Sequence, residues 1–177
     1  MGLRDAMNNN SSVVTIIAVV VLVIALGIIV MTNKGPGSSF GGQDTYFFNT
    51  ATGKLYKESP KSISPVDTSD GPKTGVLAYV YSCGQCGDYA GMTPDEVKSA
   101  NAFIGHLEKY SDTAHALILA SQAGNQPPPE QMGAMQEILI KRPQDANWVP
   151  HMGPAGIRIQ SDEASQCPDG QVTPCQP

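Results

Sequence analysis

The longest apolar segment of the chain runs without interruption from Val13 to Met31 and contains no charge and a single hydroxyl group, that of Thr15. As a helix with about 1.5 Å of rise per residue, this run is about 28 Å long, close to the hydrocarbon thickness of a bilayer. In lipid a helix satisfies its backbone hydrogen bonds internally, so the Val- and Ile-rich composition does not weigh against it. The pattern predicts one transmembrane helix over residues 13–31, after a polar leader over residues 1–12.

The flanks of this run separate an anchor from a cleaved signal peptide. The residues that follow, TNKGP, contain no small-x-small site at which a signal peptide would be cleaved. A lipobox cysteine is also absent from this region, because the first cysteine of the chain is Cys83. A buried core helix would rarely lie between a polar leader and a Gly/Ser-rich linker. The leader carries Arg4 and the α-amino group against Asp5, whereas Lys34 is the only charge close after the run, so the positive-inside rule slightly favours a cytoplasmic N-terminus. The cysteines further along the chain favour the same orientation. We therefore expect a single-pass signal anchor with its domain on the extracytoplasmic side.

Alternating and turn-forming positions dominate the next part of the chain. Residues 32–44 are rich in Gly and Ser and predict a flexible tether. Two β-prone runs, 45–49 (TYFFN) and 55–58 (LYKE), flank a segment whose glycine favours a turn, so they predict a hairpin. Residues 59–74 are rich in Pro, Ser and Asp and predict a long loop. The alternation in 75–82 (GVLAYVYS) predicts a strand that is buried on at least one face.

Helix signals appear in the second half of the chain. The segment T-P-D-E at 93–96 is a capping box with proline at the first helical position. Ser111 followed by Asp112 is typical of a helix cap, and residues 112–123 (DTAHALILASQA) predict an amphipathic helix that ends at Gly124. Two further helices are expected, one near 130–139 after a run of three prolines and one over 154–164.

The segment 103–110 (FIGHLEKY) fits either a strand or a helix, and Gly105 at its centre favours the strand. The sum is a small α+β domain over residues 45–164, with an antiparallel, meander-like sheet and two or three short helices. We expect the tail, residues 165–177, to be held only by its cysteines.

Composition limits the partners of this domain. The residues after position 31 carry 10 basic and 15 acidic side chains, a net charge of −5. This balance argues against nucleic acid or an anionic lipid surface as the main partner. Aromatic residues make up only 6% of the chain, whereas Gly (18) and Pro (14) are frequent, which indicates a loop-rich domain with a modest core.

Four cysteines provide the main chemical signal. Cys83 and Cys86 form C-G-Q-C directly after the predicted strand, and Cys167 and Cys175 lie near the end of the sequence. An even number of cysteines in an exported domain predicts structural disulfides. Turn-forming residues between Cys167 and Cys175 favour a local bridge, whereas pairing across the two clusters is the alternative. The sequence leaves the pairing open.

Two other interpretations use the same cysteines. A zinc site would take two thiolates from each cluster, although C-x7-C is wider than the usual spacing. His106, His115 or His151 could replace one of these ligands. A thiol oxidoreductase would use Cys83 and Cys86, because a strand that leads into C-x-x-C is typical of thioredoxin-like proteins. Against it, Gly87 and Asp88 begin a helix poorly, and Asp88 would raise a nearby thiol pKa. Gly87 in place of histidine excludes covalent haem.

The remaining candidate residues predict no further chemistry. His106 and His115 are expected to be surface or half-buried residues, and Glu108 and Asp112 straddle an element boundary, so they form no acid–base pair. The single tryptophan, Trp148, is expected in the core. The sequence contains no nucleophile elbow, HExxH, P-loop or dinucleotide motif. We therefore predict no catalytic residue, no metal and no cofactor.

Several segments of the chain resemble small single-span membrane proteins of planctomycete-type bacteria, for which no activity is assigned. The segments that carry the resemblance are MGLRDAMN with the following span, TGKLY (52–56), AYVYSCGQC (78–86), FIGHLEKY (103–110), NWVP (147–150) and CPDG with its later cysteine (167–175). The resemblance implies an anchored, exported domain and a strand over 103–110. It implies no functional residue.

Together these features predict a non-enzymatic accessory or interaction module of the cell envelope, anchored by residues 13–31. Its expected partners are the membrane and an envelope protein, not nucleic acid. The alternatives are a membrane-tethered thiol–disulfide redox protein that uses Cys83 and Cys86, and a zinc-stabilised domain.

Overall fold

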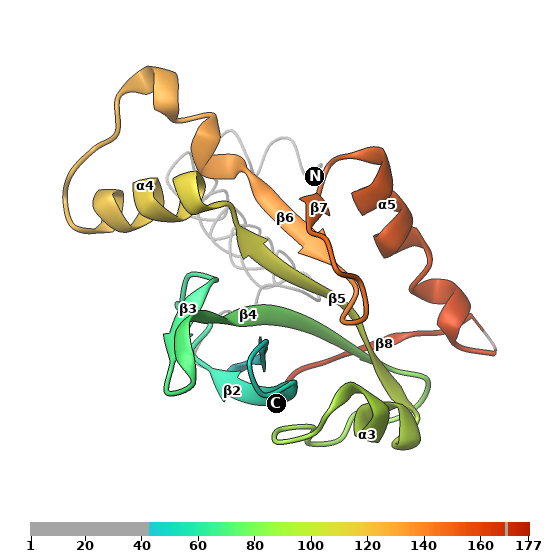
Figure 1. The fold of residues 1–177 in the computed structure, drawn as a ribbon. Coiled ribbons are helices and arrows are strands. Elements are labelled where there is room, and N and C mark those ends of the chain that lie inside the picture. Colours follow the sequence, from blue (N-terminus) through green and yellow to red (C-terminus); the bar gives the residue numbers. More distant parts are fainter. Residues whose placement is uncertain (1–42, 169) are drawn as a thin grey trace, which may run out of the picture. The chain divides into compact units, whose positions relative to one another are not determined.

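The computed structural model describes residues 43–168 and 170–177 (Figure 1). The predicted leader (1–12), the predicted membrane helix (13–31) and all but the last two residues of the tether (32–44) lie outside this part of the chain. Within the described ranges, no helix is both long and apolar enough to cross a bilayer.

One antiparallel sheet organises the domain, and its neighbouring strands follow the order β2-β1-β4-β5-β6-β7, with β3 and β8 also paired to β4. Short helices accompany it, so the predicted α+β class with an antiparallel sheet is confirmed for the described residues. The strands are β1 (Thr45–Asn49), β2 (Lys54–Glu58), β3 (Val66–Thr68), β4 (Gly71–Ser82), β5 (Ala102–Tyr110), β6 (Ile138–Lys141), β7 (Val149–Pro150) and β8 (Thr173–Cys175).

The predicted hairpin between the first two strands is confirmed. Asn49 pairs with Lys54, and its side-chain oxygen accepts hydrogen bonds from the backbone N–H groups of Ala51 (2.9 Å) and Thr52 (3.2 Å). Gly53 has a φ of +70°, a conformation that glycine adopts at no steric cost. The turn chemistry therefore explains the register of β1 on β2.

The strand β4 is the longest and lies at the centre of the sheet. One edge pairs with β5, and the other edge pairs first with β1 and then with β8. Its side chains alternate as predicted: Val76, Ala78 and Val80 are buried, while Tyr79 lies on the other face, where its ring is partly covered and the residue is 37% exposed. This alternation places the apolar core on one face of the sheet.

The prediction of a long loop over 59–74 is wrong in part, because it contains β3 and the first residues of β4. Gly75 explains this pairing. A Cβ at this position would lie 2.6 Å from Cγ2 of Val66, so only glycine lets β3 approach so closely.

Two helices begin where the caps predicted. Helix α3 (Pro94–Ser99) has the full capping box: the backbone N–H of Thr93 donates to the carboxylate of Glu96 (2.7 Å), and the Thr93 hydroxyl accepts from the Glu96 N–H (3.4 Å). Helix α4 (Asp112–Gln122) begins after Ser111, whose hydroxyl accepts from the N–H of Ala114 (3.2 Å). The segment 103–110 is a strand, as predicted, within β5.

The prediction of a helix near 130–139 is wrong. Two 3-10 turns, η1 (Pro129–Gln131) and η2 (Ala134–Gln136), are followed by β6. Gly133 lies between the two turns, and glycine weakens a continuous helix. The β-branched residues that follow pair with β5 instead, with Ile140 fully buried opposite Glu108.

The C-terminal part also differs from its prediction. Helix α5 (Pro154–Ser161) is shorter than the expected helix over 154–164, and a separate 3-10 turn, η3 (Ala164–Gln166), follows it. The tail was expected to be held only by its cysteines, yet Thr173–Cys175 forms β8 and pairs with Val80–Ser82 of β4. Backbone pairing therefore adds to the cysteine bridges.

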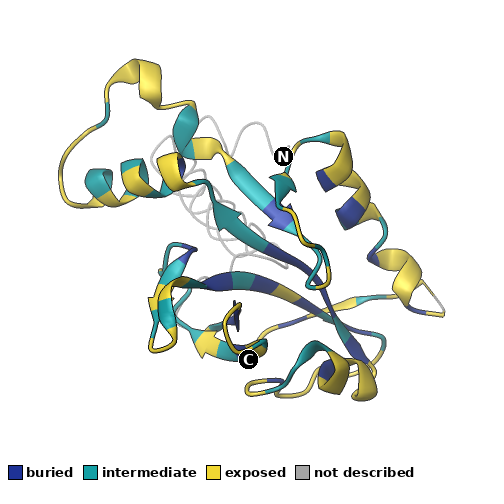
Figure 2. Cartoon of the chain, viewed as in Figure 1, coloured by how far each residue is buried: buried dark blue, intermediate teal, exposed yellow. Residues whose placement is uncertain are grey.

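Burial follows the sheet, whereas α4 and the segment with η1 and η2 extend away from it and are largely exposed (Figures 1 and 2). Met92 and Trp148 pack against the edge of the core. The buried cluster that forms the core comprises Tyr46, Phe48, Leu55, Val76, Ala78, Val80, Tyr89, Val97, Ala102, Ile104, Leu107 and Cys175.

Candidate functional site

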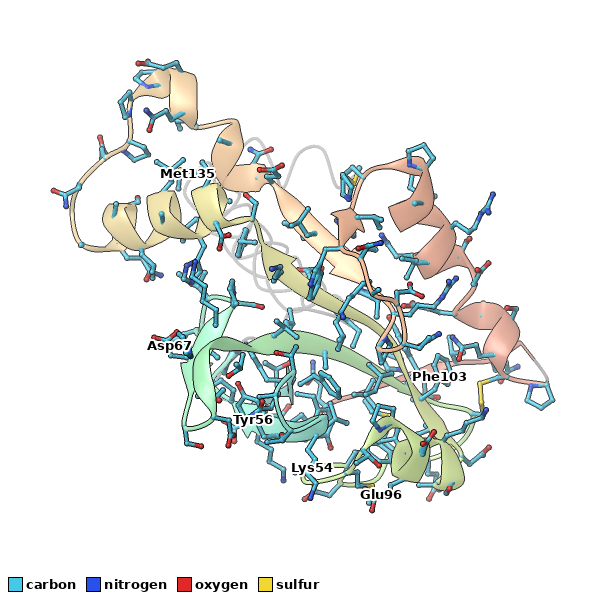
Figure 3. The ribbon with its side chains drawn as sticks, viewed as in Figure 1. Lys54, Tyr56, Asp67, Glu96, Phe103 and Met135 are labelled. Atoms are coloured by element: carbon cyan, nitrogen blue, oxygen red, sulfur yellow. A yellow bond between two sulfur atoms is a disulfide. The ribbon has the colours of Figure 1, made fainter. Side chains whose placement is uncertain are left out.

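Two disulfides join the end of β4 to the C-terminal segment (Figure 3). Cys83 is bonded to Cys167, with 5.3 Å between their Cα atoms, and Cys86 is bonded to Cys175, with 5.4 Å between theirs. The two cysteines of the C-terminal segment are buried, and Cys175 belongs to the core. The prediction of disulfides is therefore confirmed.

The pairing is the crosswise one. The local Cys167–Cys175 bridge that the intervening turn favoured does not form, although Gly170 does close a turn onto Cys167, with its N–H donating to the Cys167 carbonyl at 3.0 Å. The chain then extends as β8, which places Cys175 opposite Val80 of β4 and beside the C-G-Q-C loop. Strand pairing thus determines which sulfur atoms meet.

This pairing bears on both alternative uses of the cysteines. A thiol oxidoreductase centre requires a bridge between Cys83 and Cys86, but each of these residues is bonded to a cysteine of the C-terminal segment instead. A zinc site requires free thiolates, and all four sulfur atoms are bonded in bridges. Among the described residues, no group of three or more His, Cys, Asp or Glu side chains is placed to hold a metal ion.

A cleft of about 640 Å³ lies beside the first bridge. Its floor is residues 102–105 of β5, one wall is α3 with Lys98, and the other is the loop 142–144 between β6 and β7. Cys83 and Gln166 close one end. Figure 3 labels Phe103 of the floor between α3 and the segment that follows α5.

The walls of the cleft are fixed by contacts outside it. The Arg142 guanidinium is paired with Asp162 at 2.5 Å, and its backbone N–H donates to the carboxylate of Asp145 (3.2 Å). The carbonyl of Asn101 accepts from the N–H of Cys83 (3.1 Å) and the hydroxyl of Ser82 (3.3 Å). A cleft held in this way loses little freedom when a ligand binds.

The rim of the cleft carries both charged side chains and uncharged amides. Asp95 and Lys98 lie one helical turn apart on α3, so their charges offset each other, as do those of Arg142 and Asp162. The amides of Asn101, Gln144 and Gln166 both donate and accept hydrogen bonds; within the described part of the chain these three amide side chains have no hydrogen-bonding partner. This chemistry suits a neutral polar ligand better than a strongly charged one.

A buried imidazole–carboxylate pair lies directly after the floor of the cleft. The Nδ1 atom of His106 is 2.5 Å from Oε1 of Glu163, and the two residues are only 5% and 8% exposed. The His106 ring stacks on Tyr79, with 4.3 Å between ring centroids. The expectation of a surface or half-buried His106 is therefore wrong, because the segment after α5 covers this residue.

Gly105 makes this pair possible. A Cβ at residue 105 would lie 2.5 Å from the Glu163 carboxylate and 2.6 Å from the ring of Tyr81. Only glycine leaves the space in which Glu163 approaches the sheet. The sequence shows Gly105 as a residue that favours a strand, but nothing in it links residue 105 to residue 163.

The same face of the sheet shifts the ionisation of its neighbours. Burial, with the nearby carboxylate of Glu108, raises the pKa of Tyr79 to about 12. Burial and the charge of Glu163 likewise raise the pKa of Tyr81. Burial raises the pKa of Glu108 above its ordinary value, against the opposing influence of His106 and His151. These pKa shifts indicate that Tyr79, Tyr81 and Glu108 form a polar layer on this face of the sheet that is partly shielded from water.

The other candidate residues lie apart from this layer or at its edge. His115 is on α4 and half-buried, as expected. Trp148 packs at the edge of the core. The ammonium groups of Lys109 and Lys141 lie over its ring, 4.9 Å and 5.3 Å from the ring centroid. The cleft itself was not predicted, because its lining comes from four separate segments of the chain.

No family model, curated protein or solved structure matches this chain.

Proposed function

We propose that the chain is a single-pass membrane protein, anchored by residues 13–31 with its N-terminus in the cytoplasm and the rest of the chain on the extracytoplasmic side. There the domain acts as a non-enzymatic accessory or interaction module of the cell envelope. Its partners are the membrane, through the anchor, and an envelope protein. The net charge of −5 argues against nucleic acid as a partner.

The crosswise pairing of all four cysteines is the observation that carries this proposal. Both bridges fasten the C-terminal segment to β4, and the C-terminal cysteines are buried. Bridges of this kind persist in oxidising compartments outside the cytoplasm. An apolar run long enough to span a bilayer would keep such a domain at the membrane surface.

The geometry of the domain supports binding as its role. The titratable pair of His106 and Glu163 is covered, and it fastens the segment after α5 to the sheet. The cleft, by contrast, is accessible, rigid and lined by polar groups that are free to bind a partner. A concave surface with a few convergent polar groups is the usual form of a binding site.

The proposal is tested by measuring, in cells, whether the cysteines are oxidised and on which side of the membrane the domain lies. Thiols are trapped by acid quenching and labelled with a maleimide of high mass, before and after reduction, and spheroplasts are treated with a protease. We expect no label before reduction, four labels after it, and loss of the domain to the external protease.

A variant with Cys86→Ser and Cys175→Ser serves as the control, because it should take two labels after reduction. Ready labelling of all four cysteines without reductant, together with protection from the protease, would place the domain in the cytoplasm and overturn the proposal.

A further inference from the structure

One edge of β5 is unpaired over half of its length. On one side β5 pairs with β4 from Ala102 to Glu108, but on the other side its pairing with β6 begins only at Leu107. Residues 102–105, which have no strand beside them on that side, are also the floor of the cleft. The cleft therefore lies where a further strand would continue the line of β6.

The ladder determines which peptide groups face this cleft. The N–H of Cys83 donates to the carbonyl of Asn101 (3.1 Å), so Ser82 and Ala102 form a non-hydrogen-bonded pair of the antiparallel ladder. The next pair, Tyr81 and Phe103, then exchanges hydrogen bonds. By the same alternation, the N–H and C=O groups of Ala102 and Ile104 point away from β4 and into the cleft.

The pairing on the far side of β4 supports this assignment independently. Pro174, which has no N–H, lies opposite Tyr81. If the peptide groups of Tyr81 point toward β5, proline at residue 174 loses no hydrogen bond to β4, which is where a strand tolerates it.

The main-chain groups on the floor have no partner within the part of the chain that the structure describes. Ala102 is 3% exposed and Ile104 is 7% exposed, so both residues are largely shielded from solvent although they line the cleft. Buried peptide groups are nearly always paired, because an unpaired one is left without the hydrogen bond that water would otherwise supply. A ligand that carries its own peptide groups would satisfy them.

We infer that the cleft binds an extended polypeptide segment of a partner protein as an added strand on β5. This inference rests on the proposed function as an interaction module and names its binding site and its mode of recognition. The added strand would lie about 4.8 Å from β5, between α3 and the loop 142–144. Its hydrogen bonds to Ala102 and Ile104 supply affinity, and side-chain contacts supply specificity.

The walls define the chemistry of the segment. Because the charges of Asp95 and Lys98 offset each other, the segment is uncharged where it crosses α3. The amides of Gln144 and Gln166 bind polar side chains on its outer face. Phe103, which stacks on Tyr81 with 5.6 Å between ring centroids, offers a flat apolar surface to a small or planar side chain.

Hydrogen exchange of the full chain in phospholipid nanodiscs tests the open edge directly. Without any ligand, the amide protons of Ala102 and Ile104 should exchange at least tenfold faster than that of Phe103, which is bonded to β4. Equal protection of all three protons would show a closed edge and overturn the inference.

Selection from a displayed library of random octapeptides tests the ligand, with empty nanodiscs as the counter-selection. We expect synthetic copies of selected peptides to slow the exchange of Ala102 and Ile104. Methylation of the peptide backbone nitrogen at alternate positions should weaken binding about tenfold or more, and methylation at the positions between should not. The variant Q144A/Q166A should weaken binding, whereas the matched variant Q122A/Q136A, which removes two exposed amides elsewhere, should not.

Three results would overturn the inference: no selected peptide, binding that methylation leaves unchanged at every position, or displacement of the peptides by cellotetraose or chitotetraose, which would indicate a saccharide site. Self-association of the chain that protects Ala102 and Ile104 without peptide would assign the edge to a second copy. None of these results changes the labelling of cysteines in cells, so a failure of this inference is distinguishable from a failure of the proposed function.

Discussion

At the scale of single residues, a glycine explains how the polar layer on one face of the sheet forms. Gly105 allows Glu163 to reach His106, and a Cβ at residue 105 would contact both the Glu163 carboxylate and the Tyr81 ring. A buried carboxylate must keep its partners, because loss of them leaves a desolvated charge. The stability of the domain should therefore depend on a glycine that has no conformational role of its own.

We predict that Gly105→Ala lowers the free energy of unfolding by about 1–3 kcal/mol, the usual cost of forcing atoms into a filled site. Urea denaturation of the full chain in nanodiscs measures the change. Gly133→Ala is the matched control, because residue 133 has helical φ and ψ angles and a Cβ there would meet nothing within 4 Å. Equal stability of the two variants would contradict the account of Gly105.

The tyrosines provide a prediction for alkaline pH. Burial raises the pKa of both Tyr56 and Tyr79 to about 12, from an ordinary value of 10. The folded state disfavours tyrosinate, so these tyrosines do not lower the stability of the domain while the pH is below their ordinary pKa. As the pH rises from the ordinary pKa through the raised pKa of the folded state, the free energy of unfolding should decline. In a spectrophotometric titration, the folded chain should therefore ionise later than the urea-unfolded chain. Tyr79→Phe should remove one late-titrating group, and coincident titration curves would contradict the prediction.

At the scale of elements, the two capped helices differ in what their caps support. Helix α3 buries Val97 completely in the core, whereas α4 buries only Ala114 and otherwise extends from the sheet. Loss of a cap should therefore be transmitted to the whole domain from α3 but remain local in α4.

We predict that Thr93→Ala costs about 1 kcal/mol of global stability, since an N-cap side chain contributes about 0.5–2 kcal/mol. Ser111→Ala should mainly speed hydrogen exchange within α4. Urea denaturation and exchange measured on the same two variants separate the effects. A global loss from Ser111→Ala as large as that from Thr93→Ala would contradict this distinction.

The elements also show how far local patterns carry a prediction. Alternation and caps predicted the first hairpin, the core face of β4, and the starts of α3 and α4, because each depends on neighbouring residues. The helix expected near 130–139 failed because pairing with β5 outweighs local propensity there. Strand β8 and the cleft were not predicted, because they depend on contacts between segments far apart in the chain. The four cysteines were identified as structural, but only strand pairing determines their partners.

At the scale of the whole molecule, the two bridges are interleaved along the chain: Cys86 lies inside the loop that the Cys83–Cys167 bridge closes, and Cys175 lies outside it. The first bridge joins cysteines that are 84 positions apart, and the second joins cysteines that are 89 positions apart. Cys83 is nevertheless close to Cys86 in the sequence, and Cys167 is close to Cys175. Either bridge alone closes a long loop and restricts the unfolded chain by about 4–5 kcal/mol in the chain-entropy model. With one bridge in place, the other closes a loop of only about a dozen residues and adds about 3 kcal/mol. Their contributions are therefore not additive.

We predict that removing one pair, by Cys83→Ser with Cys167→Ser or by Cys86→Ser with Cys175→Ser, costs about 3 kcal/mol in the free energy of unfolding. Removing both pairs should cost about 7 kcal/mol, more than twice the loss from one pair, and should leave the domain largely unfolded. Denaturation of the three variants measures this. Equal and additive losses would contradict this account of the two interleaved bridges.

The position of Pro174 limits how copies of the chain can pair through their sheets. Strand β8 is three residues long, and the nitrogen of Pro174 lies on the side that faces away from β4. A short strand with proline at its outer side is a poor template for a further strand. Where copies of a chain meet at high local concentration, an unprotected sheet edge promotes aggregation. The C-terminal segment, fastened by both bridges, thus protects the edge that β8 forms against uncontrolled pairing.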